Sequence, residues 1–140
     1  KVSVLSNATY IYKEEVREAL MLVDNNILKL DTVDMDYIKK LDRPQQPNYD
    51  VKDIIKYLKM FNGHVIIQTM FLRGDGLDNT SEYYIAPWLE AVKDIKPQQV
   101  MVYTIDRETP DKNLEKAPKE VLDAIKARVE ALGIKCTASY

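Results

Sequence analysis

The stretch that decides the fold runs from residue 65 to residue 105 and reads VIIQTMFLRGDGLDNTSEYYIAPWLEAVKDIKPQQVMVYTI. It opens and closes on short runs of β-branched and apolar residues, Val65–Leu72 and Val100–Ile105, which are typical of buried strands. Between these runs, helical spacing relates Ile85, Leu89 and Val92. A strand, a helix and a second strand in this order predict two parallel strands joined by a helical crossover.

The same alternation extends to both sides of this stretch. Three further strand-like runs lie at Val2–Asn7, Ile27–Thr32 and Ile134–Ser139. Helical patterns separate them at residues 13–23, at residues 51–61 after an Asn48/Asp50 cap, and after Pro118, with a shorter helical turn at residues 35–41. We therefore expect one domain, residues 1–140, of the α/β class: a parallel sheet with alternating helices, either a doubly wound sheet or a partial, TIM-like barrel.

The connections differ in length on the two sides of the predicted sheet. Helix-to-strand connections are short, whereas strand-to-helix connections are long and polar, as in residues 31–34, 73–80 and 106–117. In parallel α/β folds the functional site is built at the carboxyl ends of the strands, so the chemistry is expected on the long loops. The third helix should be capped near Asn79 to Ser81, and Pro87 should kink it or delay its regular start.

Composition excludes several classes of protein. The 140 residues are 46% hydrophobic and 30% charged, with a net charge of −2, so no global field draws in nucleic acid or an anionic membrane. One cysteine, Cys136, excludes an internal disulfide, and with His64 as the one histidine a Cys/His metal site within the chain is implausible. No apolar run reaches the length of a spanning helix, and we expect a cytoplasmic location.

The beginning of the sequence favours a fragment. The chain starts at Lys1 and enters a strand-like run at once, whereas a natural domain rarely starts inside its core. We therefore expect a piece of a larger protein.

Two opposite charges mark the second predicted strand. Lys29 and Asp31 flank Leu30, so side-chain alternation puts both on one face of the strand. Opposite charges inside a sheet are costly unless they are paired or used. A structural ion pair and a polar floor for a zwitterionic ligand are equally open interpretations.

Further polar residues gather on the strands and at their carboxyl ends. Gln68 and Tyr103 lie within apolar strands, where a lone polar side chain is usually a satisfied core group. The same explanation does not account for five polar residues that lie at or just past the carboxyl ends of four strand-like segments: Asn7, Asp31, Arg73, Asp106 and Arg107. Together they predict a pocket that binds anions and carboxylates. Trp88 and the Tyr83–Tyr84 pair are expected to pack a helix on the sheet, Cys136 to be a small buried hydrophobe, and His64 to be a surface or edge residue.

Several segments together resemble the radical S-adenosylmethionine enzymes of the Fe–S oxidoreductase type. The resemblance is nearest to the branch related to wyosine tRNA-modifying synthases, with pyruvate-formate-lyase-activating enzymes as second choice. It is carried by Val4-Leu5-Ser6-Asn7-Ala8, Leu28-Lys29-Leu30-Asp31, Leu41-Asp42-Arg43-Pro44, residues 67–74 (IQTMFLRG) and residues 103–110 (YTIDRETP). Residues 4–8 resemble the third barrel strand, although Ala8 replaces the family's glycine, and residues 28–31 resemble the fourth barrel strand.

The resemblance implies a barrel whose first strands lie outside this chain. The family's Cys-x-x-x-Cys-x-x-Cys motif and its Gly-Gly-Glu-type strand are absent from the sequence, and both belong to the first two barrel strands. The chain would thus be the carboxyl-terminal portion of a (β/α)6 barrel. Its parent would hold a [4Fe–4S] cluster and cleave S-adenosylmethionine to a 5′-deoxyadenosyl radical, whereas the isolated chain would be inactive and hold neither group.

The resemblance also assigns residue roles. Asn7, Lys29 and Asp31 would contact S-adenosylmethionine, and the substrate cavity would be lined by Gln68, Arg73, Tyr103 and Arg107. The substrate stays open, since relatives act on peptides, tRNA, glycyl-radical proteins and small metabolites, and the charge balance does not favour nucleic acid. The expected partner is the missing amino-terminal half of the barrel, and an exposed sheet edge should favour dimerisation, strand exchange or aggregation.

Two rival interpretations of the same residues stay open. One is a different barrel enzyme, a lyase or isomerase in which Arg73-Gly74 and Arg107 would bind an anion such as phosphate. The other is a non-catalytic module with a doubly wound sheet, in which Lys29 and Asp31 are purely structural. A curved sheet with its helices on one face would exclude the non-catalytic module.

Overall fold

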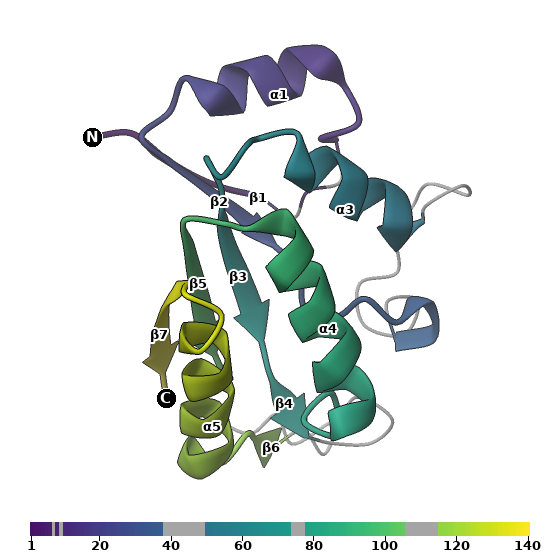
Figure 1. The fold of residues 1–140 in the computed structure, drawn as a ribbon, viewed down its shortest axis with the longest axis vertical. Helices are drawn as coiled ribbons and strands as arrows, with labels where there is room; N and C mark the ends of the chain where they lie inside the picture. The colour runs from purple at the N-terminus through teal and green to yellow at the C-terminus, as the bar shows by residue number, and fades with distance from the viewer. Residues whose placement is uncertain (7, 9, 38–49, 74–77, 106–114) are drawn as a thin grey trace.

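The computed structural model describes residues 1–140 except 7, 9, 38–49, 74–77 and 106–114. Helices and strands alternate along the chain (Figure 1). The elements, in chain order, are β1 (Ser3–Ser6), α1 (Glu14–Met21), β2 (Asn25–Lys29), α3 (Val51–Lys59), β3 (Ile66–Met70), β4 (Leu72–Arg73), α4 (Glu82–Ile95), β5 (Gln99–Tyr103), β6 (Glu115–Lys116), α5 (Lys119–Glu130) and β7 (Lys135–Ser139).

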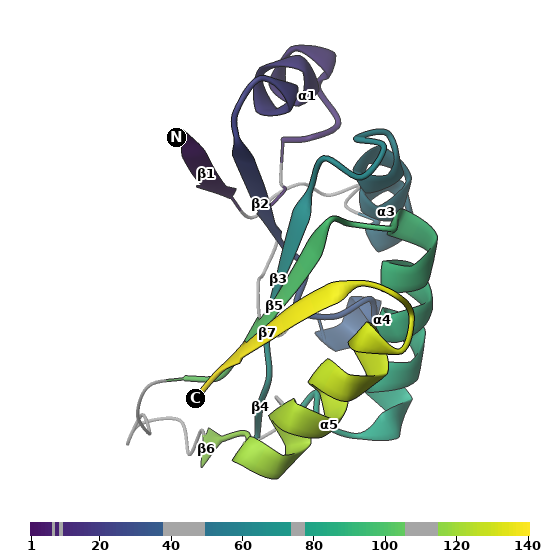
Figure 2. The ribbon, with the colours of Figure 1, turned by 60° about the vertical axis from the view of Figure 1, so that its left-hand side comes forward.

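Five strands form one sheet in the order in which they occur along the chain. The order is β1-β2-β3-β5-β7, and every pairing within it is parallel. Connections between neighbouring parallel strands are almost always right-handed, so successive crossovers put their helices on the same side of the sheet. Figure 2 shows α3, α4 and α5 together on one side of the strands. The predicted α/β fold with a partial barrel is confirmed, and the doubly wound sheet is wrong.

Alternate residues of the strands enter a single apolar core beneath the helices. Leu28, Ile67, Val100 and Val102 have almost no exposed surface, and Cys136 of β7 belongs to the same cluster. The helices contribute their apolar faces to this core, among them Leu58 of α3, Trp88 and Val92 of α4, and Leu122 and Val129 of α5. The intervening residues of β2, β5 and β7 face the other side of the sheet, where they are half-buried or exposed.

Local sequence accounts for most of the helix boundaries. The Asp50 carboxylate accepts a hydrogen bond from the Lys52 amide and caps α3, as predicted. That helix is followed by Asn62 and Gly63, both at positive φ, which return the chain to the sheet. Gly133, at φ +83°, does the same after α5. Among the described residues, no helix has the length and apolar character needed to cross a membrane.

Two local features differ from the sequence-based expectation. Pro87 does not delay α4, which begins at Glu82 and includes the proline. Tyr83 does not pack on the sheet, since 70% of it is exposed, whereas Trp88 is buried as expected.

An additional antiparallel ladder pairs β4 with β6, so that Arg73 lies opposite Glu115. This ladder joins the segments that follow β3 and β5 at the carboxyl edge of the sheet. Two of the long connections on which the chemistry was expected, the one after β3 and the one after β5, are therefore hydrogen-bonded to each other through β4 and β6.

Candidate ligand-binding site

A row of polar side chains crosses the face of the sheet opposite the helices. Lys29 of β2 lies directly beside Gln68 of β3 in the strand register. Tyr103 of β5 pairs with Met70, two residues further along β3 from Gln68. These three side chains and the end of β1 line an open depression with a volume of about 470 Å³, and its other lining residues are Leu5 and Ser6. The fold thus brings three of the predicted site residues together.

Lys29 and Asp31 form the ion pair that the sequence left as one of two interpretations. The Lys29 Nζ atom lies 3.3 Å from the Asp31 Oδ2 atom. The Asp31 side chain has no exposed surface, whereas a third of the Lys29 side chain is exposed. The Asp31 Oδ1 atom accepts a hydrogen bond from the Met70 amide at 2.9 Å. Lys29 is therefore the member of the pair that faces the depression, and the buried Asp31 carboxylate forms the ion pair with its ammonium group.

Arg73 lies apart from the depression. Its Nε atom donates a hydrogen bond to the Thr80 hydroxyl at 3.2 Å, and that hydroxyl in turn donates to the Asp78 carboxylate at 2.6 Å. These contacts direct Arg73 toward the beginning of α4. Asn7 and Arg107, the other two predicted site residues, lie outside the described residues, as does Asp106.

The predicted cap of α4 lies at Ser81, within the expected range, and Asn79 has a different role. Asn79 is fully buried, and its side chain bonds to the main chain of Asp31, Met70 and Leu72. An Asn before a helix is so common a capping signal that the residue type alone does not distinguish the two roles. The sequence pattern thus assigned Asn79 to the helix cap and not to the neighbourhood of the site.

A second buried network lies beneath the same strand ends. The Thr69 hydroxyl donates to the Leu30 carbonyl at 2.7 Å, and the Trp88 indole N–H lies 3.1 Å from the Thr69 hydroxyl and 3.3 Å from the same carbonyl. The network joins α4 to the ends of β2 and β3. It fixes the backbone between Lys29 and Asp31 from the core side.

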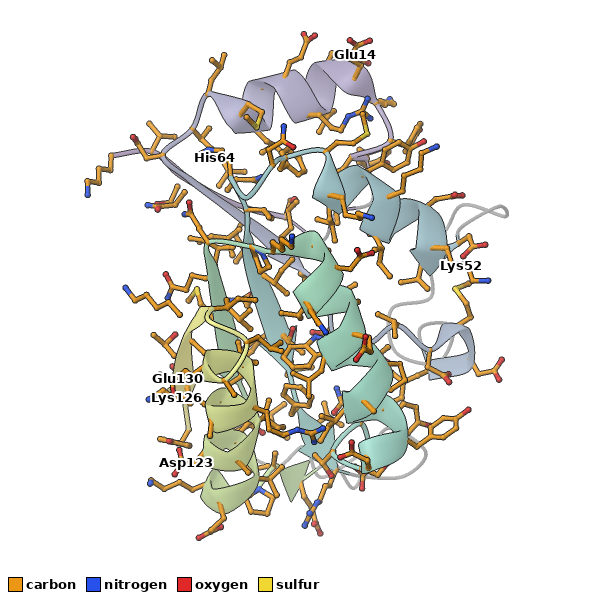
Figure 3. All side chains as sticks on the ribbon, viewed as in Figure 1. Glu14, Lys52, His64, Asp123, Lys126 and Glu130 are labelled. Atoms are coloured by element: carbon orange, nitrogen blue, oxygen red, sulfur yellow. The ribbon has the colours of Figure 1, made fainter. Side chains whose placement is uncertain are left out.

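His64 and Cys136 lie away from the depression. His64 is at the amino end of β3 (Figure 3), and its Nε2 atom is 2.7 Å from the Val23 carbonyl oxygen. Cys136 is buried, as predicted, and burial raises the pKa of its thiol to about 11, with Glu130 adding to the rise. A thiol that stays protonated at neutral pH is a poor nucleophile and metal ligand. Within the described ranges, no cluster of His, Cys, Asp or Glu could hold a metal ion.

Relatives in sequence cover most of this chain but only a part of their own length. A protein named GTPase Obg from Brachyspira hyodysenteriae is 27% identical over 133 residues, which are 93% of this chain and 19% of that protein. UPF0026 proteins of Synechocystis and Helicobacter pylori are 32% and 25% identical, respectively; each alignment covers 76% of this chain, and 40% and 34% of the relatives. The chain thus spans less than half the length of these curated relatives. No protein-family model matches it.

Solved structures with the same fold include radical S-adenosylmethionine enzymes. A domain of pyruvate-formate lyase-activating enzyme from Bacteroides vulgatus matches with a TM-score of 0.69 and 14% identity, over 99% of this chain and 82% of that one. SuiB of Streptococcus suis bound to S-adenosylmethionine matches with a TM-score of 0.69 and 15% identity, over 99% of this chain and 32% of that one. The chain has the fold of these enzymes. A radical S-adenosylmethionine methyltransferase from Sphaerobacter thermophilus matches similarly, with a TM-score of 0.67 and 15% identity, over 90% of this chain and 37% of that one.

Proposed function

We propose that this chain forms one wall of an S-adenosylmethionine site in a radical S-adenosylmethionine enzyme, as the carboxyl-terminal portion of its barrel. The observation that carries the proposal is the depression on the open face of the sheet, lined by Lys29, Gln68 and Tyr103. The likeness to solved radical S-adenosylmethionine enzymes, one of them with S-adenosylmethionine bound, supports it. The segments quoted from the sequence support the same class, with the wyosine-related branch as the proposed subgroup.

The side chains of the depression fit a zwitterionic ligand. The Lys29 ammonium offers a cation for a carboxylate, and Asp31 orients it through their ion pair. The Gln68 amide and the Tyr103 hydroxyl each donate and accept hydrogen bonds, which suits ribose hydroxyls or amino groups. S-adenosylmethionine, when bound, would supply the reactive group of the parent enzyme. Ser6, which the sequence pattern did not single out, is a further hydroxyl in the same depression.

An iron–sulfur cluster does not fit the residues of this chain. Cluster binding uses cysteine thiolates, and the sequence has one cysteine, whose thiol is buried in β7 with a raised pKa. We propose that the cluster belongs to the part of the parent that carries the first barrel strands. Reading the coding sequence that precedes Lys1 tests this point, because a Cys-x-x-x-Cys-x-x-Cys motif is expected there and its absence would overturn the assignment.

Two competing functions have less support. The anion-binding lyase or isomerase rests on Arg73 and Arg107, and Arg73 is directed toward Thr80 and does not line the depression. A GTPase activity, which the name of one relative states for that protein, would need a phosphate-binding loop. The sequence has no Gly-x-x-x-x-Gly-Lys-Ser/Thr motif, and its four glycines are at positions 63, 74, 76 and 133. The stretch that this chain shares with that relative, 19% of the relative's length, would therefore not carry a nucleotide site.

Ligand titration followed by nuclear magnetic resonance tests the binding proposal. Because the chain supplies one wall of the site, it should not retain S-adenosylmethionine, but millimolar ligand added to the ¹⁵N-labelled chain should bind weakly and shift the amide signals of Lys29, Gln68 and Tyr103 in a saturable manner. The Lys29→Met variant should weaken this binding by about tenfold, which corresponds to one charged hydrogen bond. Lys59→Met is the matched control, because Lys59 also pairs with an aspartate, Asp94, but on the helices. Shifts confined to the helical side, or none, would overturn the proposal.

A further inference from the structure

Asn79 occupies the junction between the carboxyl ends of two strands. It is fully buried, and its Nδ2 group donates to the Met70 carbonyl at 2.9 Å and to the Asp31 carbonyl at 3.1 Å. Its Oδ1 atom accepts from the Leu72 amide at 3.0 Å. One side chain thus ties the end of β2 to β3 and to β4.

Regular strand pairing stops just before this junction. The register between β2 and β3 ends at Lys29 and Gln68, and the Leu30 amide makes one more bond, to the Gln68 carbonyl. Beyond that point the backbone of β3 is hydrogen-bonded by side chains and no longer by the β2 backbone. The Asp31 carboxylate accepts from the Met70 amide, and Asn79 binds the Met70 carbonyl. Met70 is therefore held on both sides of its backbone, by Asp31 and by the asparagine that also binds the Asp31 main chain.

We infer that Asn79 is a positioning residue for the Lys29–Asp31 ion pair. The Asn79 amide fixes the Asp31 main chain, the Asp31 carboxylate then lies 3.3 Å from the Lys29 ammonium, and Lys29 faces the depression. The consequence for ligand binding rests on the proposed function, whereas the placement of the ion pair does not. Since Asn79 lies in the segment between β4 and α4, the geometry links that segment to the depression without any contact between Asn79 and the ligand.

The chemistry of an asparagine side chain suits this role. It presents an acceptor and two donors in one plane, and all of them are used here. An aspartate of the same shape would place a carboxylate oxygen against two carbonyl oxygens and would lose both donated bonds. An alanine would leave the Leu72 amide and two carbonyls without this partner inside the protein.

Asn26 provides a matched control in β2. It is also fully buried, and its Nδ2 group donates to a main-chain carbonyl, that of His64, at 3.1 Å. It lies near the amino end of β2, whereas Asn79 acts just beyond the carboxyl end. Removing either side-chain amide costs a buried hydrogen bond, so both variants should lose stability in general. Only the Asn79 variant should also change the Lys29–Asp31 ion pair.

The test compares Asn79→Ala with Asn26→Ala in the full chain. In the absence of ligand, the Asp31 carboxyl ¹³C signal and the Met70 amide signal should move in Asn79→Ala and stay in place in Asn26→Ala. The dissociation constant for S-adenosylmethionine should then rise on the order of tenfold in Asn79→Ala alone. If Asn79→Ala does not fold, Asn79→Ser, which brings no buried charge and cannot make all three of the Asn79 side-chain hydrogen bonds, gives the same comparison.

Two results would separate this inference from the proposed function. Unmoved Asp31 and Met70 signals in the Asn79 variants, or equal movement in Asn26→Ala, would overturn the positioning role. Movement confined to the Asn79 variants, in a chain that does not bind S-adenosylmethionine at all, would support the positioning role and overturn the proposed function.

Discussion

The indole N–H of Trp88 in α4 lies 3.1 Å from the hydroxyl oxygen of Thr69 in β3, which itself donates to the Leu30 carbonyl. All three residues are buried, so a partner removed here is not replaced by bulk water. The contact joins the helical layer to the carboxyl end of β2, where Leu30 lies between Lys29 and Asp31.

We predict that Thr69→Val lowers the free energy of unfolding by about 1–3 kcal/mol, because the substitution keeps the shape and removes a buried donor and acceptor. Urea denaturation followed by the fluorescence of Trp88, the single tryptophan, measures this change. Thr137→Val is the control, since Thr137 is exposed on β7 and should change the stability by no more than about 0.5 kcal/mol. Equal effects of the two substitutions would contradict the prediction.

The Lys29–Asp31 pair gives another prediction for stability. Lys29→Met leaves the fully buried Asp31 carboxylate without this cation, which destabilises a protein even where the original pair contributes little. Because Lys29 is partly exposed, we expect a loss of about 1–3 kcal/mol, less than for a pair that is buried on both sides. The double variant Lys29→Met/Asp31→Leu should recover part of the loss in urea denaturation. A double variant no more stable than Lys29→Met alone would contradict this account.

A further prediction concerns the link between α4 and α5. Two Arg128 nitrogens donate to the two Glu82 oxygens, at 2.7 and 2.9 Å. The hydrogen bonds with Arg128 lower the pKa of Glu82 below its ordinary value of 4.5. Since the pKa is lower in the folded state, the pair adds stability above the unfolded pKa and loses it as the pH falls through the folded pKa.

Titration of the Glu82 carboxyl ¹³C signal checks this prediction. Arg128→Met should return the pKa of Glu82 to its ordinary value, and Arg128→Lys should return it partway, because lysine keeps the charge but cannot make the bidentate contact. High salt should weaken the effect, since both side chains are largely exposed. An unchanged Glu82 pKa in Arg128→Met would show that the pair does not persist in solution.

Much of the fold was predictable because local pattern and global topology agree. Strand-like runs alternate with helical ones, and the strands of the main sheet pair in sequence order, so no long-range pairing had to be guessed there. The β4–β6 ladder was not predictable in this way. Each of its strands has two residues, too few for any periodicity, and the pairing joins Arg73 to Glu115, which lie 42 positions apart (115 − 73) in the chain.

The candidate site was predictable only in part. Alternation placed Lys29 and Asp31 on one face, and the ion pair confirms it. That Lys29 lies beside Gln68 depends on the register of β2 and β3, which the packing of the whole sheet sets. The role of Asn79 also depends on tertiary structure, because its partner Asp31 is 48 positions away and its residue type equally fits a helix cap.

The last prediction concerns the open face and edge of the sheet. β1 is the first strand in the sheet order, and Leu5, 61% exposed, lines the depression. An edge strand beside an exposed apolar side chain is a template for association, and a charge at such a position is how natural proteins prevent it. We predict that the chain self-associates as its concentration rises and that Leu5→Lys weakens the association several-fold.

Analytical ultracentrifugation over a range of protein concentrations measures this effect. The control is Leu22→Lys, because Leu22 is even more exposed, at 87%, but follows α1 and does not line the depression. If both substitutions weaken the association equally, general surface hydrophobicity is the cause and the role assigned to the open face is wrong. If Leu5→Lys alone restores the monomer, the face that carries Lys29 and Gln68 is the surface that the chain covers when it associates. The same substitution should then leave the amide signals of the helical side unchanged.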